Sequence, residues 1–159
     1  MHSILGNGEW FQIAWSEYPE FGQVPIAAME MLPVLVAAAL WGRKWRGLTV
    51  CSHCDNEAVV ASIQGNYCKQ PNMAHMLRCL FFLEAKFEFV CTARHIPGVD
   101  NSLADALFRN QLEVFHNLAP QARVDPTSVP QGLVEGLMRE QPWTSAAWER
   151  WFTIISSTY

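Results

Sequence analysis

The sequence predicts an α/β fold, because short segments with the periodicity of strands alternate with longer segments that have the periodicity of helices. Half of the 159 residues are hydrophobic and 16% are charged, which is enough apolar material for a sizeable core. The formal net charge of −4 counts against a strongly basic nucleic-acid-binding domain. The five cysteines are odd in number and irregularly spaced, which favours an intracellular setting, nuclear or cytoplasmic.

The predicted strands and helices alternate within the first 110 residues. Asn7-Gly8 is typical of a hairpin turn, and only six residues precede it, so the partner of the first strand can be no more than a stub. Pro33 lies within the first helical segment, where a proline removes one backbone hydrogen bond unless it falls in the first turn. The predicted strands are 9–15, 48–54 and 87–93, and the predicted helices are 24–41, 57–64, 72–86 and 102–110.

The composition changes near Pro120. The stretch 120–130 contains three prolines, so we expect a linker over 111–130, between an α/β domain over 1–110 and a helical tail over 131–159. Two short helices are predicted in the tail, at 131–140 and 144–157. The second has an aromatic face that either docks back on the domain or leads into a further one. The apolar run 31–41 is shorter than a bilayer requires, so no membrane partner is expected.

Three acidic residues stand at positions where α/β domains place active sites. Asp55 closes a predicted strand, Asp105 lies in the first turns of a predicted helix, and Glu30 lies on an apolar helix where an acid needs a partner. Taken alone, each is ordinary: a lone Asp at a strand end is more often a cap than a catalyst, and a lone Glu on a buried-looking helix can simply reach solvent. Together, three acids from different elements can hold two Mg²⁺ ions, which activate water in phosphodiester hydrolysis. The residues alone leave their convergence open.

The segments around these acids resemble one known family. Glu30-Met31-Leu32-Pro33, the segment from Cys54 to Val60 (Cys-Asp-Asn-Glu-Ala-Val-Val) and the segment from His95 to Leu107 (His-Ile-Pro-Gly-Val-Asp-Asn-Ser-Leu-Ala-Asp-Ala-Leu) are similar to the RNase H domain of DIRS-type retrotransposons. The similarity covers about 9–110. Its most specific part is the third segment, in which Asn101 follows His95 by six residues and Asp105 follows Asn101 by four.

This resemblance implies an RNase H-like mixed sheet flanked by helices and a metal-dependent endonuclease that cuts RNA in RNA–DNA hybrids. It implies that Glu30, Asp55 and Asp105 are catalytic ligands of a two-metal site holding Mg²⁺ or Mn²⁺. It also implies that His95 assists catalysis or product release. Two polar residues are placed beside the site, in contact with substrate: Asn56 and Asn101.

The chain departs from the family at its front. The family has a fourth carboxylate, an Asp on the first strand, and no Asp precedes Glu9 here. We therefore expect a domain that lacks the first strand, is truncated at both ends, and has weak or absent nuclease activity. In the family, reverse transcriptase lies upstream and a tyrosine recombinase downstream. The alternative is a non-catalytic module, derived from such a domain, that binds nucleic acid or protein.

Three other groups of residues have both a functional and a plainer structural interpretation. Cys51-Ser52-His53-Cys54 has the spacing of a zinc ligand pair but lacks a second pair, so buried thiols are expected. The basic group Arg43, Lys44 and Arg46 either contacts a hybrid backbone or ends a helix in solvent. The aromatic residues of 9–15 are assigned to core packing rather than base stacking.

Overall fold

The computed structural model describes residues 2–4, 8–130, 132–139, 149–150 and 153. This part of the chain contains both helices and strands. In chain order the elements are β1 (His2–Ile4), β2 (Trp10–Gln12), η1 (Trp15–Glu17), η2 (Pro19–Phe21), α1 (Ile26–Trp41), η3 (Gly42–Trp45), β3 (Thr49–Cys54), α2 (Glu57–Gly65), α3 (Pro71–Phe87), β4 (Val90–His95), η4 (Gly98–Asp100), α4 (Ser102–Phe108), α5 (Leu112–Leu118) and α6 (Leu133–Met138).

The strands form two small sheets. β1 and β2 pair antiparallel with Ile4 opposite Trp10, and β3 and β4 pair in parallel with Cys54 opposite His95. The α/β prediction is confirmed, but the described strands form two separate sheets and not the one mixed sheet expected. The hairpin and its three-residue partner strand are also confirmed, although residues 5–9 separate its strands where a two-residue turn was predicted.

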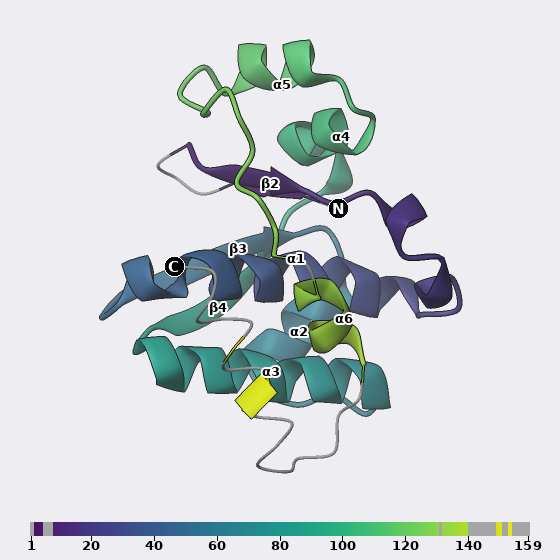
Figure 1. Cartoon of the computed structure of the whole chain (residues 1–159), viewed down its shortest axis with the longest axis vertical. Coiled ribbons are helices and arrows are strands. Elements are labelled where there is room, and N and C mark those ends of the chain that lie inside the picture. Colours follow the sequence, from purple (N-terminus) through teal and green to yellow (C-terminus); the bar gives the residue numbers. More distant parts are fainter. Residues whose placement is uncertain (1, 5–7, 131, 140–148, 151–152, 154–159) are drawn as a thin grey trace.

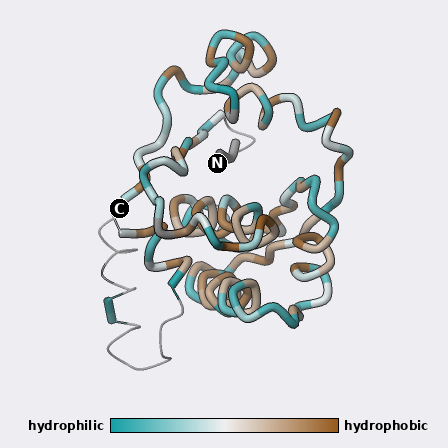
Figure 2. The backbone as a smooth tube through the Cα atoms, turned by 90° about the vertical axis from the view of Figure 1, so that its right-hand side faces the viewer, coloured by the Kyte–Doolittle hydropathy of each residue, from teal (hydrophilic) through white to brown (hydrophobic). Residues whose placement is uncertain are grey.

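Helix α1 is the centre of the main hydrophobic core. It packs against α3 and α6, and ten of its residues are buried. In Figure 1, α1 crosses the middle of the molecule between the hairpin and α3, and the side view in Figure 2 shows hydrophobic positions along these stacked helices. Pro33 lies in the interior of α1 and not in its first turn. Because proline has no N–H, the helical hydrogen bond from residue 33 to the carbonyl of Met29 is missing.

The apolar character of this region extends further than the run 31–41. Together α1 and η3 form a 20-residue helical segment, Ile26–Trp45, that has the length and hydropathy of a membrane-spanning helix. Of the 18-residue window that meets this criterion, 61% is buried within the protein. Its packing on α3 and α6 accounts for its composition as a core helix.

Local signals explain the helix boundaries on either side of β4. Helices α2 and α3 lie within one residue of their predicted ranges, and Asn66 ends α2 in the left-handed conformation. Strand β4 starts at Val90 and not at residue 87, because α3 continues to Phe87. Glu88 then takes a φ of 58° and donates its N–H to the carbonyl of Glu84, which is a helix termination.

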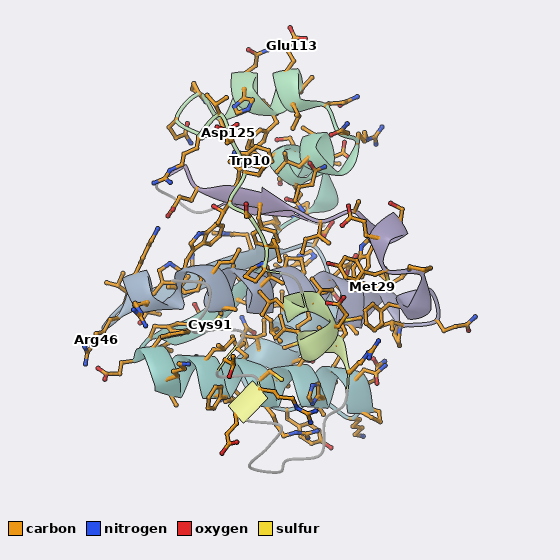
Figure 3. All side chains as sticks on the ribbon, in the orientation of Figure 1. Trp10, Met29, Arg46, Cys91, Glu113 and Asp125 are labelled. Carbon is orange, nitrogen blue, oxygen red and sulfur yellow. The ribbon has the colours of Figure 1, made fainter. Side chains whose placement is uncertain are left out.

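The segment 111–130, expected as a linker, contains helix α5. Phe115 of this helix and Ala119, which follows it, are fully buried in a second hydrophobic cluster, which also contains Trp10 of the hairpin and Ala106 and Leu107 of α4. Figure 3 shows Trp10 between the hairpin and these two helices.

The chain after α5 runs back along β2. The N–H of Arg123 donates to the carbonyl of Gly8 at 2.9 Å, and the N–H of Thr127 donates to the carbonyl of Trp10 at 2.6 Å. The Trp10 indole donates to the carbonyl of Arg123 at 2.7 Å. Residues 121–127 therefore cover one edge of the hairpin.

The tail is described in part. Its first predicted helix, 131–140, is seen as the shorter α6, which packs against α1 and α3. The second predicted helix, 144–157, falls almost entirely outside the described residues. The predicted strand 9–15 is shortened to β2, because η1 begins at Trp15.

Glu84 on α3 supports a pH-dependent prediction. Burial raises the pKa of its carboxyl, against the opposing effect of the Cys91 N–H that donates to it. A raised folded-state pKa means that protonated Glu84 stabilises the fold relative to ionised Glu84. This contribution is complete below the unfolded pKa of about 4.3 and is lost as the pH rises through the folded pKa.

We therefore expect Glu84→Gln to raise the melting temperature at neutral pH. Glutamine keeps an oxygen for the Cys91 N–H and cannot ionise. Below the unfolded pKa of glutamate, about 4.3, the two proteins should melt together, since both side chains are then neutral. Thermal unfolding followed by circular dichroism across the pH range measures this, and an equal gain at every pH would contradict it.

Candidate functional site

Asn56 joins two elements at the carboxyl end of β3. Its Oδ1 accepts the N–H groups of Ala58 and Val59 at 2.9 and 3.2 Å, which caps the N-terminus of α2. Its Nδ2 donates to Oε2 of Glu30 on α1. The side chain expected to contact substrate is therefore engaged within the protein, and it holds the carboxylate of Glu30 beside the start of α2.

Asp55 lies next to this pair and is exposed to solvent. The loop after β4 comes alongside it, since a Cβ placed on Gly98 would lie 3.7 Å from Asp55 Oδ2. The carboxyl ends of parallel strands meet at one edge, and here β3 ends beside His95 of β4.

The carboxylates of Glu30 and Asp55 both affect the pKa of the Cys54 thiol. Burial raises its pKa most, the donated N–H of Asn56 lowers it, and the negative charges of Glu30 and Asp55 raise it further. Two of the three predicted acids thus gather around one buried thiol. The thiol is kept protonated by these neighbours, which makes it a poor nucleophile and a poor metal ligand.

Asp105 is engaged elsewhere. Its carboxylate forms an ion pair with Arg109, one turn later on α4, with Nε and Oδ1 2.9 Å apart and both side chains more than half exposed. Helix α4 packs on the hairpin, where Gln12 donates to the carbonyl of Leu107 at 2.8 Å. Among the side chains that the structure describes, no three from His, Cys, Asp or Glu lie close enough together to hold a metal ion.

The donor set therefore differs from the one the family uses. Mg²⁺ is commonly held by one or two carboxylates with water and substrate phosphate as further ligands. Glu30 and Asp55 suit one such ion. The described residues do not assemble the three-carboxylate, two-metal site, and that site stays a prediction.

His95 and Asn101 flank the loop between β4 and α4. His95 is exposed at the end of β4, one register position from Asp55. Asn101 is half-buried at the N-cap position of α4, but its side chain makes no capping hydrogen bond there. Their roles in catalysis and substrate contact stay predictions.

The expectation of buried thiols is confirmed for Cys54 and wrong for Cys51. Cys51 and His53 are exposed on one side of β3 and Cys54 is buried on the other, and all five thiols are free. Two members of the basic group are held by acids. Lys44 binds Glu9, and Arg46 makes a two-point ion pair with Glu88 at 2.8 Å. Contact of this group with a nucleic-acid backbone would compete with these pairs.

Glu9 is a buried charge that the sequence analysis missed. Only 3% of the residue is exposed, and its two oxygens accept from Lys44 Nζ at 2.6 and 2.8 Å. Arg123 approaches Oε1 at 3.4 Å. The one local signal was an acid beginning an apolar strand, and neither partner is near it in sequence.

Comparison with known proteins does not assign the chain to a family. No family model, no curated protein and no solved structure matches it.

Proposed function

We propose that the chain is an RNase H-like domain of retroelement origin that cleaves RNA–DNA hybrids weakly or not at all. The observation that supports this most is the hydrogen bond from Asn56 to Glu30, which brings Glu30 to the strand end occupied by Asp55. Both acids belong to the segments that resemble the family. His95 at the end of β4 and Gly98 in the loop that follows lie against the same strand end.

The weak activity follows from the acids that are in place. Two carboxylates suit one divalent cation, whereas hydrolysis by two metal ions needs a second cation to stabilise the leaving oxygen. Asp105 would have to leave Arg109 to contribute. The ligand proposed is an RNA–DNA hybrid, with reverse transcriptase and a tyrosine recombinase as the neighbouring domains and a nuclear or cytoplasmic setting.

A cleavage assay tests the proposal. The purified chain is incubated with an end-labelled RNA–DNA hybrid and Mg²⁺ or Mn²⁺, and we expect little or no product, at most a small excess over that of the Asp55→Asn variant. The matched control is an RNA duplex of the same sequence. Robust cleavage of the hybrid that Asp55→Asn abolishes would overturn the claim of weak activity, and would support the family's nuclease mechanism.

The alternative is a non-catalytic binding module. The engagement of Asn56 and Asp105 within the protein favours it, because both side chains are satisfied without substrate. Hybrid affinity measured with and without Mg²⁺ separates the two. Affinity that needs the metal and falls in Asp55→Asn supports a residual site, whereas equal affinity in all conditions supports a plain binder.

A further inference from the structure

The outer edge of β4 has backbone groups that face away from β3. The N–H of Val90 donates to Leu48 at 2.9 Å and that of Ile96 donates to Cys54 at 3.0 Å, so the even-numbered residues of β4 face β3. The backbone N–H and C=O groups of Cys91 and Ala93 therefore point away from β3. Among the described strands, none pairs with this edge.

Two side chains from neighbouring helices form hydrogen bonds with these outward backbone groups. Glu84 of α3 accepts the N–H of Cys91 at 2.6 Å. Gln64 of α2 donates to the carbonyl of Ala93 at 2.8 Å. One donor and one acceptor of the strand edge are thus satisfied by side chains, in the way that a neighbouring strand would satisfy them.

Among the described residues, open space lies beside this edge, although Ala93 itself is only 2% exposed. An open groove of about 680 Å³ lies between β4, α2 and α3, and Gln64 and Glu84 both line it. The strand residue Val90 is 54% exposed, and Phe81 on the far wall is 37% exposed. A strand edge flanked by exposed apolar side chains is a template for pairing with another chain. Figure 3 labels Cys91 on this strand.

We propose that Gln64 and Glu84 close the outer edge of β4 against strand addition by a second copy of this chain. Each side chain binds the backbone group that an added strand would need. A pairing strand must therefore break both hydrogen bonds and displace both side chains before it gains its own.

A second copy is the occupant that fits this edge by symmetry. An antiparallel pairing of two β4 strands about Thr92 places Cys91 of one copy opposite Ala93 of the other, so the outward donors and acceptors meet in pairs. Such a contact uses the same surface on both copies and closes as a dimer. The exposed side chains of Val90 would be covered on both copies.

The test removes both side chains from the full-length chain. We expect Gln64→Ala/Glu84→Ala to dimerise at least about tenfold more tightly than the natural sequence, since about 1 kcal/mol per lost hydrogen bond no longer opposes pairing. Sedimentation equilibrium over a wide concentration range measures the dimerisation constant. The Gln64→Ala variant alone, which keeps Glu84, should shift the constant in the same direction by less. Circular dichroism verifies that each variant is folded.

Two matched variants decide the cause. Glu84→Gln keeps the acceptor for Cys91 and removes only the charge, so it should associate no more than the natural sequence. Adding Cys91→Pro to the double variant removes an outward N–H that β3 does not use, which edge strands tolerate, and should abolish the dimer. The proposal is overturned if the double variant associates no more than the natural sequence, or if its association survives Cys91→Pro.

Discussion

Replacing Gly8 with alanine is expected to lower the free energy of unfolding by roughly 3–5 kcal/mol. Gly8 has a φ of +83°, which L-residues with a Cβ rarely adopt. An added Cβ would also lie 2.1 Å from the carbonyl oxygen of Gln121, a contact with backbone that no side-chain rotation relieves. The hairpin and the segment 121–127 would have to separate.

Gly47 provides the matched control for this substitution. It has a similar φ of +73°, but no atom lies within 4 Å of a Cβ built on it. Gly47→Ala should therefore cost about 1–2 kcal/mol, the strain of the left-handed conformation alone. Urea unfolding followed by tryptophan fluorescence compares the two. Equal losses would show that the approach of Gln121 to Gly8 contributes nothing.

Trp10→Ala is expected to destabilise the protein by about 3–5 kcal/mol, in the range measured for large aromatic side chains in cores. Trp10 is 2% exposed, its ring centroid lies 5.0 Å from that of Phe115, and its indole N–H binds the carbonyl of Arg123. It is the largest member of the second hydrophobic cluster. Its loss removes the surface on which both α4 and α5 pack.

Hydrogen exchange shows where this loss acts. Amides of α4, α5 and 121–127 should exchange faster in Trp10→Ala, while those of α1 and α3 change little. The control is Trp45→Ala, in the main core, where Trp45 packs on Trp41 and Phe89. That variant should expose α1 and β4 first. Uniform exchange throughout the chain in both variants would mean that the two clusters unfold as one unit.

The parts of the fold that depend on local signals were predictable. Helices α2 and α3 and strand β3 match their predicted ranges within one residue. Each has its own boundary signal, such as Asn56 as a cap and Gly65-Asn66 as a stop. The ion pair of Asp105 with Arg109 also has a local signal, the spacing of four residues on one helix face, which the sequence analysis did not use.

The parts that depend on distant residues were not predictable. Glu9 is stabilised in the interior by Lys44 and Arg123, which lie far along the chain. Helix α5 follows the same logic, since its burial requires Trp10 of the hairpin. Composition alone made 111–130 look like a linker, because prolines indicate where regular structure ends and not what the chain packs against.

In the candidate site, too, the features set by local sequence were predictable and those set by distant contacts were not. The placement of Asp55 at a strand end followed from local periodicity, and the hydrogen bond from Asn56 to Glu30 joins two segments singled out by the resemblance. The position of α4 did not follow, because it is set by contacts with the hairpin through Gln12 and Leu107. Convergence of three acids depends on that packing, which no motif encodes.

The contact between Trp10 and Arg123 spans 113 residues and sets an order of events during synthesis. Chains emerge from the ribosome N-terminus first, and contacts between distant residues form late. Helices α2 and α3 and the β3–β4 pair can form as soon as they emerge. Trp10 must wait, with its indole uncovered, until α5 and residues 121–127 have been made. The hairpin is thus made before α5 but is completed only after residues 121–127 have been made.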